Sequence, residues 1–111
     1  MKPIVVPLVA LVLALQGALS AAAAQDWRYC VAQDEAARRV FVTPAFETDE
    51  PIDALERAFN HYLDAAAGNH HWGICPRAPS REMALDDIEA AARYNRMLGL
   101  AREDLGWPST P

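Results

Sequence analysis

The chain has 111 residues, a hydrophobic content of 52%, a formal net charge of −5 and two cysteines. A chain of this length is too short for two sizeable domains, and this hydrophobic content is too high for a wholly disordered protein. The negative charge also argues against a general nucleic-acid binder, which needs a basic face to displace counterions from phosphates.

The first 24 residues have the order of a secretory signal peptide. Lys2 is their only charge, residues 4–15 form an apolar run, and small residues then lead to a cleavage site after Ala24. The apolar run has 12 residues, fewer than the roughly 20 that a bilayer-spanning helix needs. We therefore predict a signal peptide over residues 1–24. The alternative is an uncleaved membrane anchor over residues 4–24.

Removal of the signal peptide leaves a domain of ordinary composition. About 46% of the remaining residues are apolar, and nine arginines against 15 carboxylates give a net charge of −6. We predict one small exported domain over residues 25–107 and a flexible tail over residues 108–111. No second apolar stretch reaches 18 residues, so we expect no membrane span after cleavage and a periplasmic or secreted location.

Both cysteines, Cys30 and Cys75, lie in the exported part of the chain. An exported domain enters an oxidising compartment, where two thiols in one small domain usually pair. The alternative is a redox or catalytic cysteine, but the spacing is not Cys-x-x-Cys and no lysine adjoins either thiol. We therefore predict a structural disulfide between Cys30 and Cys75.

The first predicted element is a β-hairpin. Its first strand covers residues 29–32, and residues 39–43, which are rich in β-branched and aromatic side chains, form the partner strand. Pro44 ends the second strand because proline has no N–H to donate. The connector over residues 34–37 predicts a loop of about four to six residues, and a helical conformation of residues 33–39 is the alternative.

The first predicted helix begins near Pro51. Thr48 supplies a capping oxygen, acidic residues follow in the first turn, and proline favours the first helical positions. Apolar residues then recur at the spacing of a helix of about 16 residues with one apolar face: Ile52, Leu55, Phe59, Tyr62, Leu63 and Ala66. Gly68 and Asn69 end this helix because both tolerate the left-handed cap conformation.

A short strand over residues 70–75 and a loop precede the second predicted helix. Ser80 caps this helix, an apolar stripe continues through it, and Gly99 ends it. Glu89 and Arg93 are four residues apart in the orientation that favours an ion pair. The residues after Gly99 hold too few apolar side chains to assign an element.

The predicted order is strand, strand, helix, strand, helix. A β-hairpin followed by helix-strand-helix predicts a small α+β domain in which two helices pack on one face of a small sheet. The disulfide would join the first strand to the third.

The histidines raise the question of a metal site. His61, His70 and His71 lie near Cys75 in the sequence, but zinc needs three or four ligands that converge in a tetrahedron. Adjacent residues of a strand point to opposite faces, and Cys75 is expected to be oxidised, so we predict no metal ligand here. A cysteine nucleophile that uses His71 as its base would need a free thiol.

Motifs for catalysis or cofactor binding are missing from the sequence. There is no Gly-x-Ser-x-Gly turn, no calcium loop and no glycine-rich phosphate loop. We therefore assign no catalytic residue and no cofactor.

Three tryptophans are many for so small a core. Trp27 and Trp107 lie near the two ends of the exported domain, and Trp72 lies between the predicted helices. One interpretation is that they cover the edges of the core. The other is that one or two are exposed anchors for a partner, which is a role that tryptophan favours in interfaces.

These observations favour a non-enzymatic binding protein whose partner is another protein or a component of the cell envelope. The possible interaction residues are Trp72, His70, His71 and Trp107. A first alternative is an inhibitor-like acidic binder of a cationic extracytoplasmic hydrolase, because opposite charge speeds encounter. A second alternative is a small enzyme or metal-binding protein that uses His70 and His71.

Overall fold

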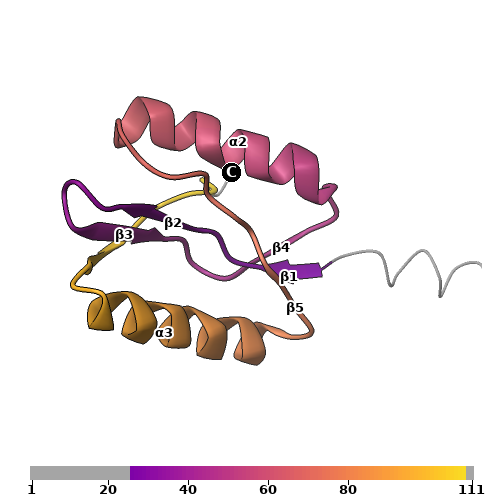
Figure 1. Cartoon of the computed structure of the whole chain (residues 1–111). Helices are drawn as coiled ribbons and strands as arrows, with labels where there is room; N and C mark the ends of the chain where they lie inside the picture. The colour runs from indigo at the N-terminus through magenta and orange to yellow at the C-terminus, as the bar shows by residue number, and fades with distance from the viewer. Residues whose placement is uncertain (1–25, 110–111) are drawn as a thin grey trace, which may run out of the picture.

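The computed structural model describes residues 26–109, and the predicted signal peptide lies outside this range. Within it, two helices and six short strands follow one another along the chain (Figure 1). The strands are β1 (Asp26–Arg28), β2 (Val31–Asp34), β3 (Arg39–Val42), β4 (Phe46–Thr48), β5 (Arg77–Ala78) and β6 (Ala101–Asp104). The helices are α2 (Ile52–Ala66) and α3 (Arg81–Met97). The α+β class predicted from the sequence is confirmed.

The strands form two sheets of three strands each. In the first sheet β1 lies between β4 and β5 and is antiparallel to both, so that Trp27 pairs with Glu47 on one side and Ala78 on the other. In the second sheet β3 lies between β2, which is antiparallel to it, and β6, which is parallel to it. Only Tyr29 and Cys30 separate β1 from β2, so one stretch of chain joins the two sheets.

The predicted β-hairpin is confirmed. β2 and β3 pair from Val31 opposite Val42 to Asp34 opposite Arg39, and a four-residue turn joins them. Asp34 organises the turn: one carboxylate oxygen accepts the backbone N–H of Ala37 at 3.2 Å, and the other accepts Nε–H of Arg39 at 3.0 Å. The connector is therefore a turn and not a helix.

This turn predicts a loss of stability in acid. The backbone N–H of Ala37 and the guanidinium of Arg39 hold the pKa of Asp34 below its ordinary value of 3.8. Because its pKa is lowered in the folded state, the ionised carboxylate of Asp34 stabilises the fold at pH values above its ordinary pKa. This stabilisation is lost as the pH falls through the folded-state pKa. We expect Asp34→Asn to be less stable than wild type at about pH 6, and the difference to be smaller at about pH 2. Urea unfolding at both pH values measures the difference, and an equal difference at both would contradict this role of Asp34.

The two helices lie on opposite sides of the strands (Figure 1), so the expectation that both pack on one face of a sheet is wrong. Phe41 packs in a cluster with Leu55 of α2, whereas its neighbours Val40 and Val42 pack in a second cluster with Ile88 of α3. Successive side chains of a strand point to opposite faces, so β3 supplies both clusters. A continuous apolar run of this kind is typical of a strand that is covered on both faces.

The boundaries of both helices agree with the sequence. The cap predicted at Thr48 is wrong, because Pro51 is the N-cap residue of α2, no side chain caps this helix, and Oγ1 of Thr48 accepts the backbone N–H of Glu50 at 3.1 Å instead. Ser80 caps α3 as predicted, by accepting the backbone N–H of Met83 at 3.2 Å. Gly68 and Gly99 follow the two helices with φ of 79° and 82°. Glycine adopts this left-handed conformation without steric cost, so both helices end where the sequence predicts.

The predicted strand over residues 70–75 is wrong. This segment is extended, but it forms only one isolated bridge, between Ile74 and Val31. The side chain of Asn60 in α2 satisfies the backbone groups of Gly73 that a neighbouring strand would otherwise bind. Its Oδ1 accepts the N–H of Gly73 at 2.7 Å, and its amide donates to the Gly73 carbonyl at 3.0 Å. The short strand β5 forms instead within the region that the sequence predicts as a loop.

Three further strands, β1, β4 and β6, are not predicted from the sequence. All four residues of β6 are exposed, and three of them are charged, so the strand has no apolar pattern. Its position is fixed by backbone pairing with β3 and by its flanks, since Leu100 is buried and the N–H of Leu105 donates to the carbonyl of Val42 at 2.9 Å.

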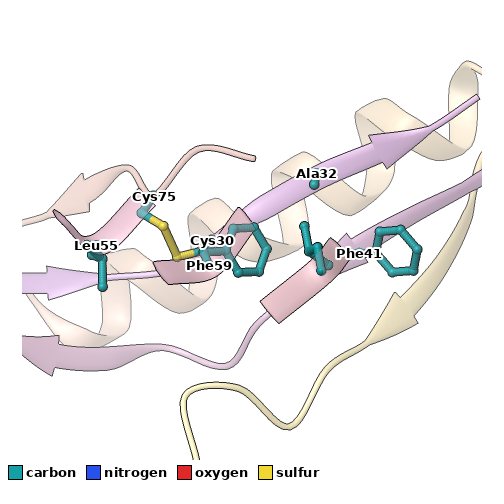
Figure 2. Packing of buried hydrophobic residues seen from close by; sticks show 7 residues of the cluster. Cys30, Ala32, Phe41, Leu55, Phe59 and Cys75 are labelled. Atoms are coloured by element: carbon teal, nitrogen blue, oxygen red, sulfur yellow. A yellow bond between two sulfur atoms is a disulfide. The ribbon is translucent and has the colours of Figure 1, made fainter. Parts of the chain in front are cut away.

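The predicted disulfide between Cys30 and Cys75 is confirmed. Both cysteines are fully buried, and they pack with Phe59 and Leu55 of α2 in the cluster that Figure 2 shows. Cys30 lies between β1 and β2, and Cys75 ends the extended segment before β5. The disulfide therefore joins the junction of the two sheets to the segment that carries Trp72, rather than one strand to another.

Candidate functional site

Trp72 lies on a segment that is fixed along the outer side of β2. The N–H of His71 donates to the carbonyl of Gln33 at 2.7 Å, and Ile74 exchanges two backbone hydrogen bonds with Val31 at 2.9 and 3.0 Å. Extended backbone alternates its side chains between two faces, so the buried Gly73 faces α2 while Trp72 and Ile74 are left at the surface.

An open groove of about 290 Å³ lies beside these two side chains. Trp72 is 60% exposed and Ile74 is 48% exposed, although both are large apolar side chains. We call this feature the Trp72 groove and define it by its lining residues: Val31, Ala32, Gln33, His71, Trp72, Ile74 and Asn95.

The indole of Trp72 is oriented by a carboxylate of α2. Its Nε1–H donates to one oxygen of Glu56 at 3.4 Å, and the other oxygen of Glu56 accepts the backbone N–H of Cys75 at 3.0 Å. One side chain thus contacts both the exposed tryptophan and the backbone beside the disulfide. The ring of Trp72 is therefore exposed, and the hydrogen bond to Glu56 favours one orientation of it.

The opposite wall of the groove belongs to α3. The side-chain amide of Gln33 in β2 donates to Oδ1 of Asn95 at 2.6 Å, and the amide of Asn95 donates to the carbonyl of Ala91 at 2.8 Å. Tyr94 and Leu98 are exposed and lie on the flank of α3 that faces away from β6.

The two adjacent histidines point toward different partners. The ring of His70 is only 6% exposed, and its nitrogens lie 2.7 Å from Asp64 Oδ1 and 2.7 Å from the carbonyl of His71. The ring of His71 is exposed, and its Nε2 lies 3.6 Å from Oε1 of Glu35. Both rings border a second hollow, of about 320 Å³, next to the hairpin turn.

The histidines do not form a converging ligand set. Within residues 26–109, no group of three or more histidine, cysteine, aspartate or glutamate side chains is placed to hold a metal ion. His61 lies on the exposed side of α2, and both nitrogens of His70 already have hydrogen-bond partners. Both cysteines of the chain are in the disulfide, so neither is a free nucleophile.

Trp107 covers an edge of the core. It is half-buried, and its ring centroid lies 5.2 Å from that of Phe59, 6.0 Å from that of Phe46 and 6.1 Å from that of Tyr62. Trp27 is also half-buried, in the central strand of the first sheet. Among the three tryptophans, Trp72 is therefore the one that is largely available to a partner.

The sequence predicts Trp72 and its neighbour His71 as interaction residues but not Glu56, Gln33 or Asn95. The alternation of Trp72 and Ile74 within an extended segment was the available signal for a shared face. The other groups come from β2, α2 and α3, and only the folded chain brings them to the same place.

Residues 26–109 contain no helix that is both long and apolar enough to cross a bilayer. Comparison with models of protein families, with curated protein sequences and with solved structures finds no match to this chain.

Proposed function

We propose that this protein is an exported, non-enzymatic binding protein that docks a basic protein surface through the Trp72 groove. The observation that carries the proposal is the exposed pair Trp72 and Ile74 beside a groove of about 290 Å³. Tryptophan is the side chain most enriched among residues that dominate binding energy.

The groove combines an apolar surface with limited mobility. Glu56 orients the indole of Trp72, and the hydrogen bonds of His71 and Ile74 fix the segment to β2. A side chain that is already ordered loses less conformational entropy on binding, so more of the contact energy remains as affinity. An apolar side chain of the partner would enter the groove between Trp72 and α3.

Charge favours a basic partner. Residues 25–111 carry nine arginines and 15 carboxylates, and two of those carboxylates, Glu35 and Glu56, lie next to groove residues His71 and Trp72. Opposite charges on the partner would speed association and fix its orientation. A cationic extracytoplasmic hydrolase is the partner class that combines this charge with the same compartment.

Export supports the same proposal. The buried disulfide is consistent with an oxidising compartment, and the sequence predicts a signal peptide that would deliver the chain there. A small disulfide-bonded domain with one fixed apolar anchor suits the recognition of another extracytoplasmic protein.

The test compares Trp72→Ala with Met97→Ala. Met97 is 85% exposed on the far side of α3 from Asn95, so its removal controls for the loss of exposed apolar surface alone. The probes are lysozyme and ribonuclease A as cationic hydrolases and cytochrome c as a basic protein that is not a hydrolase. We expect Trp72→Ala to weaken hydrolase binding by about 2 kcal/mol, roughly 30-fold, while Met97→Ala changes it little.

Calorimetry at two salt concentrations measures the affinity and the contribution that electrostatic attraction makes to it. Binding should weaken as salt rises, because the encounter surface is acidic. Equal affinities for the two variants, or no binding of wild type to any of the three probes at low salt, would contradict the proposal.

A further inference from the structure

A second surface feature lies on the other flank of α3 and plays no part in the proposed docking. It is a cleft of about 340 Å³ between the C-terminal half of α3 and the start of β6. We call it the arginine cleft and define it by its lining residues: Glu89, Ala92, Arg93, Arg96, Leu100, Ala101 and Arg102.

The charge of this cleft is opposite to that of the chain. The cleft is lined by three arginines and one carboxylate, and a second carboxylate, Asp104, pairs with Arg102, so the local balance is one positive charge although the whole chain has a net charge of −5. The negative end of the α3 dipole, about half a charge, offsets only part of this excess. The cleft is therefore a basic patch on an acidic protein.

Arg102 uses its guanidinium within the protein. Its Nη1 donates to both oxygens of Glu89 at 3.0 and 3.1 Å, and its Nε donates to Asp104 at 2.9 Å. The ion pair expected between Glu89 and Arg93 does not form, because Glu89 pairs with Arg102 instead. Arg93 consequently loses the partner that its position in the helix offers.

Arg93 and Arg96 have no ion-pair partner among the residues that the structure describes. They are three residues apart on one side of α3, where like charges repel each other. The small side chains of Ala92 and Ala101 leave space in front of them, and Leu100 is buried beneath. Two unpaired guanidinium groups thus border a hollow that has room for a ligand.

A fourth guanidinium lies at the same end of the molecule. A Cβ added to Gly99 would lie 3.7 Å from Nη1 of Arg38, so the Arg38 side chain passes over this glycine. The backbone of Arg38 is also joined to β6, because its carbonyl accepts the N–H of Ala101 at 2.9 Å. Arg38 thus lies near the C-terminal end of α3, but it borders a separate hollow with Glu35, Leu98 and Leu100 and does not line the arginine cleft.

We propose that the arginine cleft binds a phosphate group, with Arg93 and Arg96 as its direct ligands and Arg102 as the rigid wall beside them. Guanidinium groups donate in a planar fork that matches phosphate oxygens, and charge-assisted hydrogen bonds of this kind are the strong ones. The two positive charges of Arg93 and Arg96 are better matched by a doubly charged phosphate ligand than by a ligand with a single carboxylate. The phosphate can belong to a soluble molecule or to a lipid headgroup.

The experiment titrates inorganic phosphate into the whole protein at constant ionic strength and follows amide chemical shifts by NMR. We expect saturable shifts over residues 92–102 in wild type. Arg93→Gln with Arg96→Gln should weaken phosphate binding at least about tenfold, because both direct ligands are lost. Both side chains are exposed, and glutamine is a good helix former, so the variant is expected to fold.

The matched control is Arg57→Gln with Arg81→Gln, which removes the same charge at two exposed arginines outside the cleft. This control should keep the affinity of wild type within about twofold. Arg93→Lys with Arg96→Lys keeps the charge but loses the fork, and it should bind phosphate with intermediate affinity.

Two results would overturn the proposal. One is the absence of saturable shifts in wild type, and the other is an equal loss of affinity in the cleft variant and the control. Vesicles of phosphatidylcholine, with and without phosphatidic acid, then distinguish the source of the phosphate. Selective binding to the phosphatidic acid vesicles assigns the site to a lipid headgroup, and binding of inorganic phosphate alone assigns it to a soluble ligand.

Discussion

Replacement of both cysteines, by Cys30→Ala with Cys75→Ala, is expected to lower the free energy of unfolding by about 4 kcal/mol. The disulfide closes a loop with a sequence separation of 45, and the chain-entropy model assigns about this stabilisation to a loop of that length. Both cysteines are also fully buried against Leu55 and Phe59, so the smaller alanines leave space in the core.

Chemical unfolding of the oxidised wild type, the reduced wild type and the double variant measures this contribution. The reduced wild type separates the effect of the cross-link from the effect of side-chain volume. A small domain has a total stability of about 5–15 kcal/mol, so we expect a large fall in the denaturant concentration at which half of the protein is unfolded. A loss of less than about 1 kcal/mol would mean that the disulfide has no major structural role.

Gly73→Ala is expected to lower the free energy of unfolding by about 3 kcal/mol. A Cβ at this position would overlap the ring of Phe59, which is fully buried in α2 and cannot move away. Any shift of the segment would also strain the two hydrogen bonds between Gly73 and Asn60. Because Trp72 is the preceding residue, the same substitution should weaken binding at the Trp72 groove.

Gly106→Ala provides the matched control. A Cβ at Gly106 has no heavy atom within 4 Å, so the same change in side chain should alter the stability by less than about 0.5 kcal/mol. Thermal or urea unfolding of the two variants gives the comparison. Equal stabilities of Gly73→Ala and Gly106→Ala would contradict the close packing of the segment on α2.

The sequence predicts the elements whose signals are local. The hairpin follows from the β-branched residues of β3 and the polar turn before them, and α3 follows from the cap at Ser80 and the stop at Gly99. The disulfide follows from the predicted compartment and from the presence of only two cysteines. None of these predictions requires knowledge of which element lies beside which.

The predictions that failed concern tertiary arrangement. Residues 70–75 alternate like a strand, but Asn60 satisfies the backbone of Gly73 from a helix, and the composition of the segment does not reveal this. β6 is charged throughout and forms because the chain after Leu100 returns beside β3. The placement of the helices on opposite faces was detectable in the uninterrupted apolar run of β3.

In the candidate sites too, local features can be predicted from the sequence, whereas tertiary contacts cannot. Trp72 stands out in the sequence as a tryptophan far from the ends of the domain, but its orientation by Glu56 depends on the packing of α2. The arginine cleft could not be predicted, because the local rule pairs Glu89 with Arg93 and the fold pairs Glu89 with Arg102 instead.

The most direct test of the central claim is an amide chemical-shift map of the protein in complex with a cationic hydrolase, with lysozyme as the first probe. The proposal predicts that the perturbed amides cluster over residues 31–33, over residues 71–75 and at Asn95, which include the residues that line the Trp72 groove. Perturbations confined to β6 and the arginine cleft, or spread evenly over the acidic surface, would contradict it.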